Sequence, residues 1–371
     1  MKYTAFLFMS LVALSSVQSD DDPDTPTEPV EPAPQYESEG ISIPAALADE
    51  PIAEFSPGRA ADYLEQGATA WNREKQCITC HTNGTYLFIR PALASTLGPP
   101  SDEIRDFFVE QLKELQETEP EQLQQGVGPA QLIYLAAGLA QWDAYVSHAV
   151  SDQTTAALHL MLELQNEDGT WGAVDCWPPF ESSAYQEATM AAMALTAVPD
   201  WLAAVTDELA LNRVERLRTY LKETAPPHDY ARVLKLWTSI QFEGILPDDE
   251  RDQIISLLLQ KQRPDGGWNI RDFALPEEWG DGGRAEKLRA ETEAAKATSD
   301  GHMTGLALIV LLQTEAPDSA ESVRRGVDWL KGHQRESGRW WTRSLNTDKQ
   351  HFITFSGTAY PLLALQLFES Q

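Results

Sequence analysis

The sequence predicts an all-α protein in which six helical hairpins form one large domain. Apolar residues recur with helical spacing from about residue 60 to residue 369, and punctuation at Pro99-Pro100, Gly128-Pro129, Pro226-Pro227 and Pro317 falls between helices. An internal repeat, which recurs in three of the hairpins, is the second observation that favours this class. With 371 residues, of which 42% are hydrophobic, the chain can bury a large core.

Composition excludes several classes of protein. The 28 Lys and Arg residues against 57 Asp and Glu give a net charge of −29, which argues against a nucleic-acid partner or a polybasic membrane-surface protein. Three cysteines are too few for a disulfide scaffold. After the first twenty residues no apolar run is long enough to span a bilayer, so we expect no membrane-spanning segment.

Residues 1–19 have the layout of a secretory signal peptide. Lys2 precedes an apolar run over 5–14, and Val17-Gln18-Ser19 offers small residues for cleavage. We therefore expect the mature protein to be exported, to the periplasm or the extracellular space.

The next segment, 20–55, contains eleven acidic residues, seven prolines and no basic residue. Such a segment repels itself and has little to bury, so we expect a disordered, acidic, Pro-rich linker that ends where the helical domain, 56–371, begins.

Helical periodicity and punctuation place the six hairpins in order along the chain. The expected helix pairs are 60–75 with 85–96, 101–118 with 128–146, 151–165 with 183–198, 207–223 with 228–242, 248–262 with 301–314, and 319–334 with 355–369.

Three hairpins share a short repeat in which Gln is followed by Gly four residues later and by Trp six residues later. The copies are Gln165 to Trp171, Gln262 to Trp268 and Gln334 to Trp340. A disguised fourth copy has Gly67, Trp71 and Gln76, and then Gly84 and Tyr86 after an insert that contains Cys77, Cys80 and His81.

The repeat resembles the QW repeat of the squalene-hopene cyclase and protein prenyltransferase superfamily. The resemblance implies that the six hairpins close into an (α/α)6 toroid, with inner helices around a central cavity. The insert 77–83 and the connections 166–182, 263–300 and 335–354 each join an outer helix to an inner helix, so we expect all four at one end of the toroid, its functional mouth.

Cys77-Ile78-Thr79-Cys80-His81 is a c-type haem attachment motif. Two thiols are spaced to add to the haem vinyl groups, and His81 is positioned as an axial iron ligand. The motif predicts covalent haem c, with a redox or electron-transfer role and a redox partner. His302, at the start of the fifth inner helix, is the candidate second iron ligand.

Other chemistries remain open for the same residues. Zinc is the alternative cofactor, held by Cys80, His81 and, in that case, Cys176. Cysteines of an exported protein can also be oxidised to a structural disulfide.

Two further functions stay open. Squalene-hopene cyclases use an Asp-x-Asp-Asp motif to supply a proton, and this chain lacks it, so we do not expect that reaction. A zinc-dependent or isoprenoid-handling enzyme using the toroid cavity remains one alternative. A haem-free binding protein for an apolar small molecule or a glycan is the other.

Overall fold

The computed structural model describes residues 32–172, 178–180, 183–292 and 298–371. The chain divides into two units, 1–33 and 34–371, and the fold is that of the second unit. The predicted signal peptide, 1–19, lies outside the described residues.

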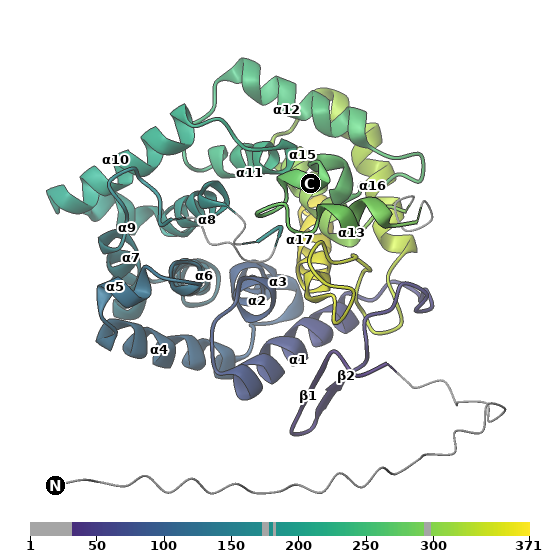
Figure 1. The fold of residues 1–371 in the computed structure, drawn as a ribbon, viewed down its shortest axis with the longest axis horizontal. Helices are drawn as coiled ribbons and strands as arrows, with labels where there is room; N and C mark the ends of the chain where they lie inside the picture. Colours follow the sequence, from purple (N-terminus) through teal and green to yellow (C-terminus); the bar gives the residue numbers. More distant parts are fainter. Residues whose placement is uncertain (1–31, 173–177, 181–182, 293–297) are drawn as a thin grey trace, which may run out of the picture. The chain divides into compact units, whose positions relative to one another are not determined.

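Two concentric rings of helices make up the second unit (Figure 1). Outer and inner helices alternate along the chain, so each inner helix runs antiparallel to the outer helix before it. The outer helices are α1 (Pro57–Lys75), α4 (Asp102–Glu117), α7 (Asp152–Glu163), α10 (Glu208–Glu223), α12 (Asp248–Lys261) and α16 (Ala320–Gly332). The inner helices are α2 (Thr85–Ile89), α6 (Gly128–Trp142), α8 (Ala184–Ala197), α11 (Asp229–Ser239), α15 (Gly301–Gln313) and α17 (Ser356–Glu369). The predicted all-α toroid of six hairpins is confirmed.

Short elements connect or extend these helices. They are α3 (Ala94–Leu97), α5 (Pro120–Leu123), α9 (Pro199–Ala204) and α13 (Ala285–Ala290), with strands β1 (Tyr36–Ser38) and β2 (Ile41–Ile43). The first inner helix, expected as one piece over 85–96, is broken into α2, a 3-10 turn at Arg90–Leu93, and α3. Pro91 lies at the break, and its ring lacks the N–H that a continuous helix requires at that position.

Each complete repeat forms the same hydrogen-bonded turn after an outer helix. The glutamine amide donates to the carbonyl of the glycine four residues on, and the tryptophan indole N–H donates to a carbonyl in the last turns of the outer helix. The glutamine bonds are Gln165 to Gly169 at 3.1 Å, Gln262 to Gly266 at 2.7 Å and Gln334 to Gly338 at 2.8 Å. The indole bonds are Trp171 to Met161 at 2.7 Å, Trp268 to Leu258 at 2.8 Å and Trp340 to Leu330 at 2.8 Å.

The glycine of each turn lies against the next outer helix. Gly169, Gly266 and Gly338 have φ of 89°, 98° and 92°, in the left-handed region that favours glycine. A Cβ at any of them would meet a backbone carbonyl closer than 3.0 Å, at Arg216, Arg325 and Arg59 respectively. These carbonyls belong to α10, α16 and α1, so each repeat joins one hairpin to the next.

The third repeat closes the ring. The amide of Gln334 accepts from the backbone N–H of Ser56 at 2.6 Å and donates to the Ser56 carbonyl at 2.9 Å. Ser56 is the N-cap of α1, so this side chain joins the last hairpin to the first.

The disguised fourth copy does not form this turn. Gln76 is instead the left-handed C-cap of α1, with φ of 52°, and Gly84 has the helical φ of −64°. The insert therefore replaces the repeat turn with a different local structure.

Residues 34–55 pack on the helical ring, so this part of the predicted linker 20–55 belongs to the folded unit. Tyr36 and Ile43, from the β1–β2 hairpin, are 3% and 2% exposed. Arg339, from the third repeat, forms an ion pair with Glu50 at 2.8 Å and donates to the carbonyls of Pro44 and Ala45. The acidic, Pro-rich composition predicted a linker, because composition alone does not show that Arg339 binds this segment.

The described helices include none that is both long and apolar enough to cross a membrane.

Ring closure predicts that the same substitution at two equivalent glutamines lowers the free energy of unfolding by different amounts. Gln334→Ala removes three hydrogen bonds, two of them between the ends of the ring, whereas Gln165→Ala removes one. We expect free energies of unfolding lower by about 3 and about 1 kcal/mol respectively, measured by urea unfolding. Equal losses would show that ring closure does not depend on Gln334.

Candidate functional site at the mouth of the ring

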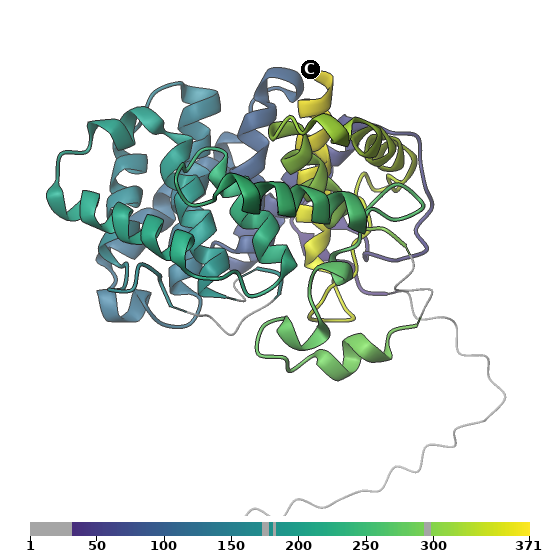
Figure 2. The same cartoon turned by 90° about the horizontal axis from the view of Figure 1, so that it is seen from above.

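The long connections gather at the end of the ring where the inner helices begin. The N–H of Gly301 donates to the carbonyl of Trp341 at 3.0 Å, and the ring of Phe180 lies 5.6 Å from that of His302. The ring of His81 lies 4.9 Å from that of Phe352. The described parts of the four connections therefore lie at one end of the ring, as predicted. Figure 2 shows the part of one connection that carries α13 projecting from the helices.

Asn83 holds the Cys77–His81 segment in its conformation. Its side-chain oxygen accepts from the N–H groups of Thr79, at 2.8 Å, and Gly84, at 2.9 Å. Its amide donates to the carbonyl of Cys77 and to Asn72. The side chain of Asn83 is fully buried, so four hydrogen bonds fix the turn between α1 and the π-helical turn Cys80–Gly84.

His81 lies between aromatic rings at the mouth. It stacks on Phe352 with an interplanar angle of 7° and meets the ring of Trp71 at 89°. Its Nδ1 lies 2.7 Å from the Thr82 hydroxyl, which is also 3.0 Å from the hydroxyl of Tyr36. Burial lowers the pKa of His81 to about 3, so its imidazole is neutral at pH 7.

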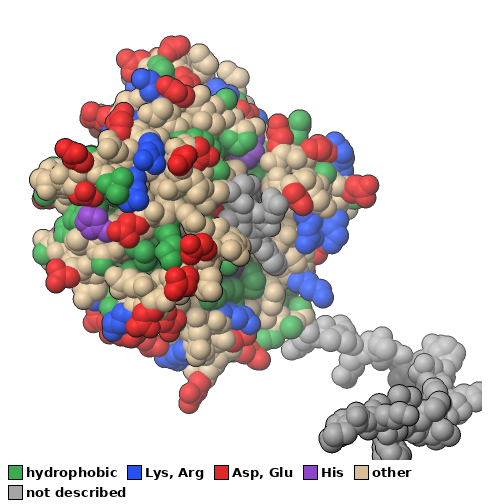
Figure 3. Space-filling model, turned by 60° about the vertical axis from the view of Figure 1, so that its left-hand side comes forward, with side chains coloured by type: hydrophobic (Ala, Val, Ile, Leu, Met, Phe, Trp, Pro, Cys, Tyr) green, Lys and Arg blue, Asp and Glu red, His purple; other side chains and the backbone are tan. Residues whose placement is uncertain are grey.

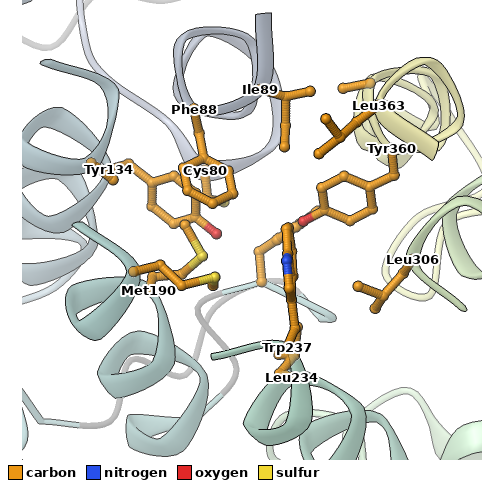
Figure 4. Close-up of a cluster of buried hydrophobic side chains, with 14 of the residues drawn as sticks. Cys80, Phe88, Ile89, Tyr134, Met190, Leu234, Trp237, Leu306, Tyr360 and Leu363 are labelled. Carbon is orange, nitrogen blue, oxygen red and sulfur yellow. The ribbon is translucent and has the colours of Figure 1, made fainter. Parts of the chain in front are cut away.

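The two cysteines of the motif differ in environment. Cys77 is half-buried, whereas Cys80 is 1% exposed and belongs to the cluster at the centre of the ring (Figure 4). Cys176, the third possible zinc ligand, lies outside the described residues. Within the part of the chain that the structure describes, no three His, Cys, Asp or Glu side chains are grouped to hold a metal ion.

His302 is the centre of a buried hydrogen-bond chain. Its Nε2 lies 3.0 Å from the Tyr230 hydroxyl, and its Nδ1 lies 2.8 Å from the Ser356 hydroxyl. The Ser356 hydroxyl donates to the carbonyl of Ile353, so it accepts from Nδ1–H, and Nε2 accepts from Tyr230. Both ring nitrogens are thus occupied, and ligation of a metal by His302 would require one bond to break.

Side chains from the inner helices fill the ring centre around this chain. Figure 4 shows Tyr134, Met190, Trp237 and Tyr360 extending from different inner helices toward one another. Tyr134 accepts from the Gln186 amide at 3.1 Å, and burial raises its pKa well above the usual value. The centre is packed and largely apolar, and the Tyr134 hydroxyl, the Tyr230 hydroxyl and the His302 ring in it are hydrogen-bonded.

Asp300 fixes the start of α15 beside His302. Its carboxylate accepts from the N–H groups of Met303, at 2.8 Å, and Ile270, at 2.7 Å. Burial raises its pKa to about 6, although these hydrogen bonds favour the charged form.

On the outside of the molecule, acidic and basic side chains are interspersed over the face shown in Figure 3.

Sequence reasoning missed several residues that build the mouth. Asn83, Thr82, Tyr230 and Ser356 gave no signal of their own, because each acts on a partner distant in the sequence or on the backbone. The available signal was position, since Tyr230 and Ser356 both lie in the first turn of a predicted inner helix.

The four hydrogen bonds of the Asn83 side chain predict a large loss of stability when that side chain is removed. We expect Asn83→Ala to lower the free energy of unfolding by about 3 kcal/mol, because it leaves buried backbone groups without partners. Asn212→Ala, at an exposed position on α10, is the matched control and should change stability by less than about 0.5 kcal/mol. Similar losses in the two variants, measured by denaturant unfolding, would contradict the role of Asn83.

His302 predicts a pH dependence of stability. Burial lowers its pKa to about 3, so between pH 3 and about 6.5 the unfolded chain binds a proton at this residue that the folded chain does not. This contribution makes the free energy of unfolding fall as the pH falls through that window. In His302→Gln the slope should decrease by about one proton, with His148→Gln as an exposed control. An unchanged slope in His302→Gln would contradict a buried neutral imidazole.

The chain matches no protein-family model and no curated protein. Among solved structures it is similar to ent-copalyl diphosphate synthase from Streptomyces platensis, with 16% identity and a TM-score of 0.45, over 77% of this chain and 50% of that one. This chain thus spans half the length of that protein. It is also similar to the type II terpene cyclase MstE from Scytonema, with 12% identity over 84% of this chain and 99% of that one. The TM-scores are 0.46 for the apo form and 0.47 for a variant in complex with geranylgeranyl dihydroxybenzoate, its substrate. The resemblance is one of helical architecture.

Proposed function

We propose that the protein is exported and binds haem c covalently through Cys77 and Cys80, with His81 as an axial ligand. The observation that carries the proposal is the donor set itself. Two thiols and an imidazole in the order Cys-x-x-Cys-His lie between α1 and α2. The sequence also begins with a segment that has the layout of a signal peptide.

The chemistry of His81 fits this role. Its imidazole is neutral, as a metal ligand must be, because burial lowers its pKa. A proton on Nδ1, donated to the Thr82 hydroxyl, leaves the lone pair on Nε2 for the iron. Thr82 is held in turn by Tyr36, so the orientation of the imidazole has its own support.

Attachment of haem to the motif requires a change in the packing around it. Phe352 covers one face of His81, and Cys80 faces the ring centre rather than the mouth. A porphyrin bound by both thiols therefore requires Cys80 to turn outward and Phe352 to leave the face of His81. His302 is not part of the proposed site, because Tyr230 and Ser356 occupy its two nitrogens.

Bound haem would supply a one-electron redox centre, and the protein would exchange electrons with a partner at the mouth. The chain's own residues contribute the anchorage and orientation: two thioether-forming thiols, one ligand imidazole and the aromatic rings of Trp71 and Phe352 beside it. The role that follows is electron transfer or redox sensing.

The proposal predicts a covalent cofactor when the full chain is produced in a host with haem c maturation. The protein should be red, and the denatured chain should retain a haem-sized mass increment. Cys77→Ala combined with Cys80→Ala should abolish that increment, whereas Cys176→Ala, at the one cysteine outside the motif, should retain it. His81→Ala should alter the absorption spectrum of the iron without releasing the haem.

Two results would contradict this function. A colourless protein without a retained mass, from a host that matures another haem c protein, would exclude covalent haem. Stoichiometric zinc that is lost on acid denaturation and on Cys176→Ala would indicate the zinc alternative instead.

A further inference from the structure

The end of the ring opposite the mouth contains a pocket of about 220 Å³. The last turns of the inner helices surround it. Its apolar floor is formed by Phe88, Ile89, Met193, Trp237 and Leu363, and its polar rim includes Gln141, Gln241, Gln313 and Gln366. A wider pocket of about 660 Å³, between α8, α9 and the ends of α6 and α11, shares Gln141, Tyr145 and Gln241 with it. The two pockets adjoin at these residues, and together we call them the distal pocket.

The distal pocket is uncharged. None of the residues that line either part is Asp, Glu, Lys or Arg, although these types make up 23% of the chain. The lining therefore offers no counter-charge to an ionic ligand, so an uncharged ligand is favoured.

The rim and floor nevertheless offer hydrogen bonds. The side-chain amides of Gln141, Gln241 and Gln313 make no hydrogen bond to the described residues, and each presents two donors and an acceptor. The indole N–H of Trp237 donates to none of the described residues either, although this side chain is only 8% exposed. Figure 4 shows Trp237 extending from α11 toward the middle of the ring.

The direction of the inner helices adds to this preference. All of them end at the distal pocket, so their dipoles present partial negative charge there, which disfavours anions such as phosphates. Several of the last carbonyls already accept hydrogen bonds from nearby side chains, such as Ala192 from Thr196 and Leu311 from Thr314. The rim amides are therefore the polar groups left for a ligand, and an amide both donates and accepts, as a hydroxyl does.

Aromatic rings complete the site. Trp237 lies at the floor, with its ring centroid 5.8 Å from that of Phe88, and Tyr145 is 45% exposed at the rim. The face of a sugar ring that carries only C–H groups packs well against the electron-rich face of an aromatic ring. A linear alcohol would fill the floor but leave the rim amides without partners.

We propose that the distal pocket binds a neutral saccharide, with its hydroxyl groups bonded by the glutamine amides and the Trp237 N–H, and with one sugar ring packed on Tyr145. The site is remote from the cysteine motif, so this inference does not rest on the proposed haem function.

The test uses the full chain and defined probes. Maltotriose, cellotriose and triacetylchitotriose are the neutral saccharides, and trigalacturonic acid and farnesol are the anionic and apolar comparators. We expect at least one neutral trisaccharide to bind with a millimolar Kd by calorimetry and by saturation-transfer NMR, and neither comparator to compete with it.

Variants place the binding in the distal pocket. Trp237→Phe keeps an aromatic ring and removes the N–H, and should weaken binding about tenfold. Gln141→Ala combined with Gln241→Ala should weaken it by at least about tenfold, while Gln253→Ala, at an exposed glutamine on outer helix α12, should leave it unchanged.

Three results would overturn the proposal. The first is the absence of binding of all three neutral trisaccharides at millimolar concentration. The second is stronger binding of farnesol or of trigalacturonic acid, and the third is saccharide binding that survives both the Trp237 and the glutamine variants.

Discussion

The repeat turn after an outer helix is the interaction on which the ring depends. In each copy a glutamine amide closes the turn on a glycine carbonyl, and that glycine lies against the backbone of the next outer helix. A side chain at the glycine would separate the two hairpins, so the same residue serves turn geometry and close approach. The last copy makes this contact with the first hairpin, where Gln334 bonds both backbone groups of Ser56. A chain of hairpins thereby becomes a closed ring rather than an open solenoid, and its inner face is buried without a capping repeat.

Closure also makes the two ends of the ring chemically different. Because every inner helix follows an outer one, all inner helices point the same way, and their amino ends meet at the mouth while their carboxyl ends meet at the distal pocket. The mouth collects side chains that long connections can bring to a helix start, such as the cysteine motif, Phe352 and His302. The distal end collects carbonyls and neutral amides from the last helical turns. One topological rule therefore accounts for the separation of two unlike sites.

The parts of this structure that follow from local sequence were predictable, and the parts that follow from distant contacts were not. Helical periodicity and Pro or Gly punctuation place all six hairpins, because each depends on residues close in the chain. The first repeat misled the prediction because Gly67, Trp71 and Gln76 have the right spacing, whereas Asn83 supplies the hydrogen bonds that shape the turn. The segment 34–55 has the composition of a linker, yet Arg339, about three hundred residues later, supplies the guanidinium that pairs with the Glu50 carboxylate and donates to the Pro44 carbonyl. The hydrogen-bond chain through His302 likewise joins three inner helices and has no signature in any one of them.

The packed centre decides which functions this fold can accommodate without rearrangement. Tyr134, Tyr230, Tyr360 and His302 are at most 3% exposed, so they fill the centre of the ring. To admit a ligand there, the protein would have to expel several aromatic side chains, each of which contributes on the order of 2 kcal/mol by its burial. It would also have to break the Tyr230–His302–Ser356 bonds in a low-dielectric interior, where unpartnered polar groups are costly. A ligand in the distal pocket meets no such barrier, and haem at the mouth requires only Cys80 and Phe352 to move. The packed centre thus separates the two ends of the ring and favours function at those ends over chemistry within it.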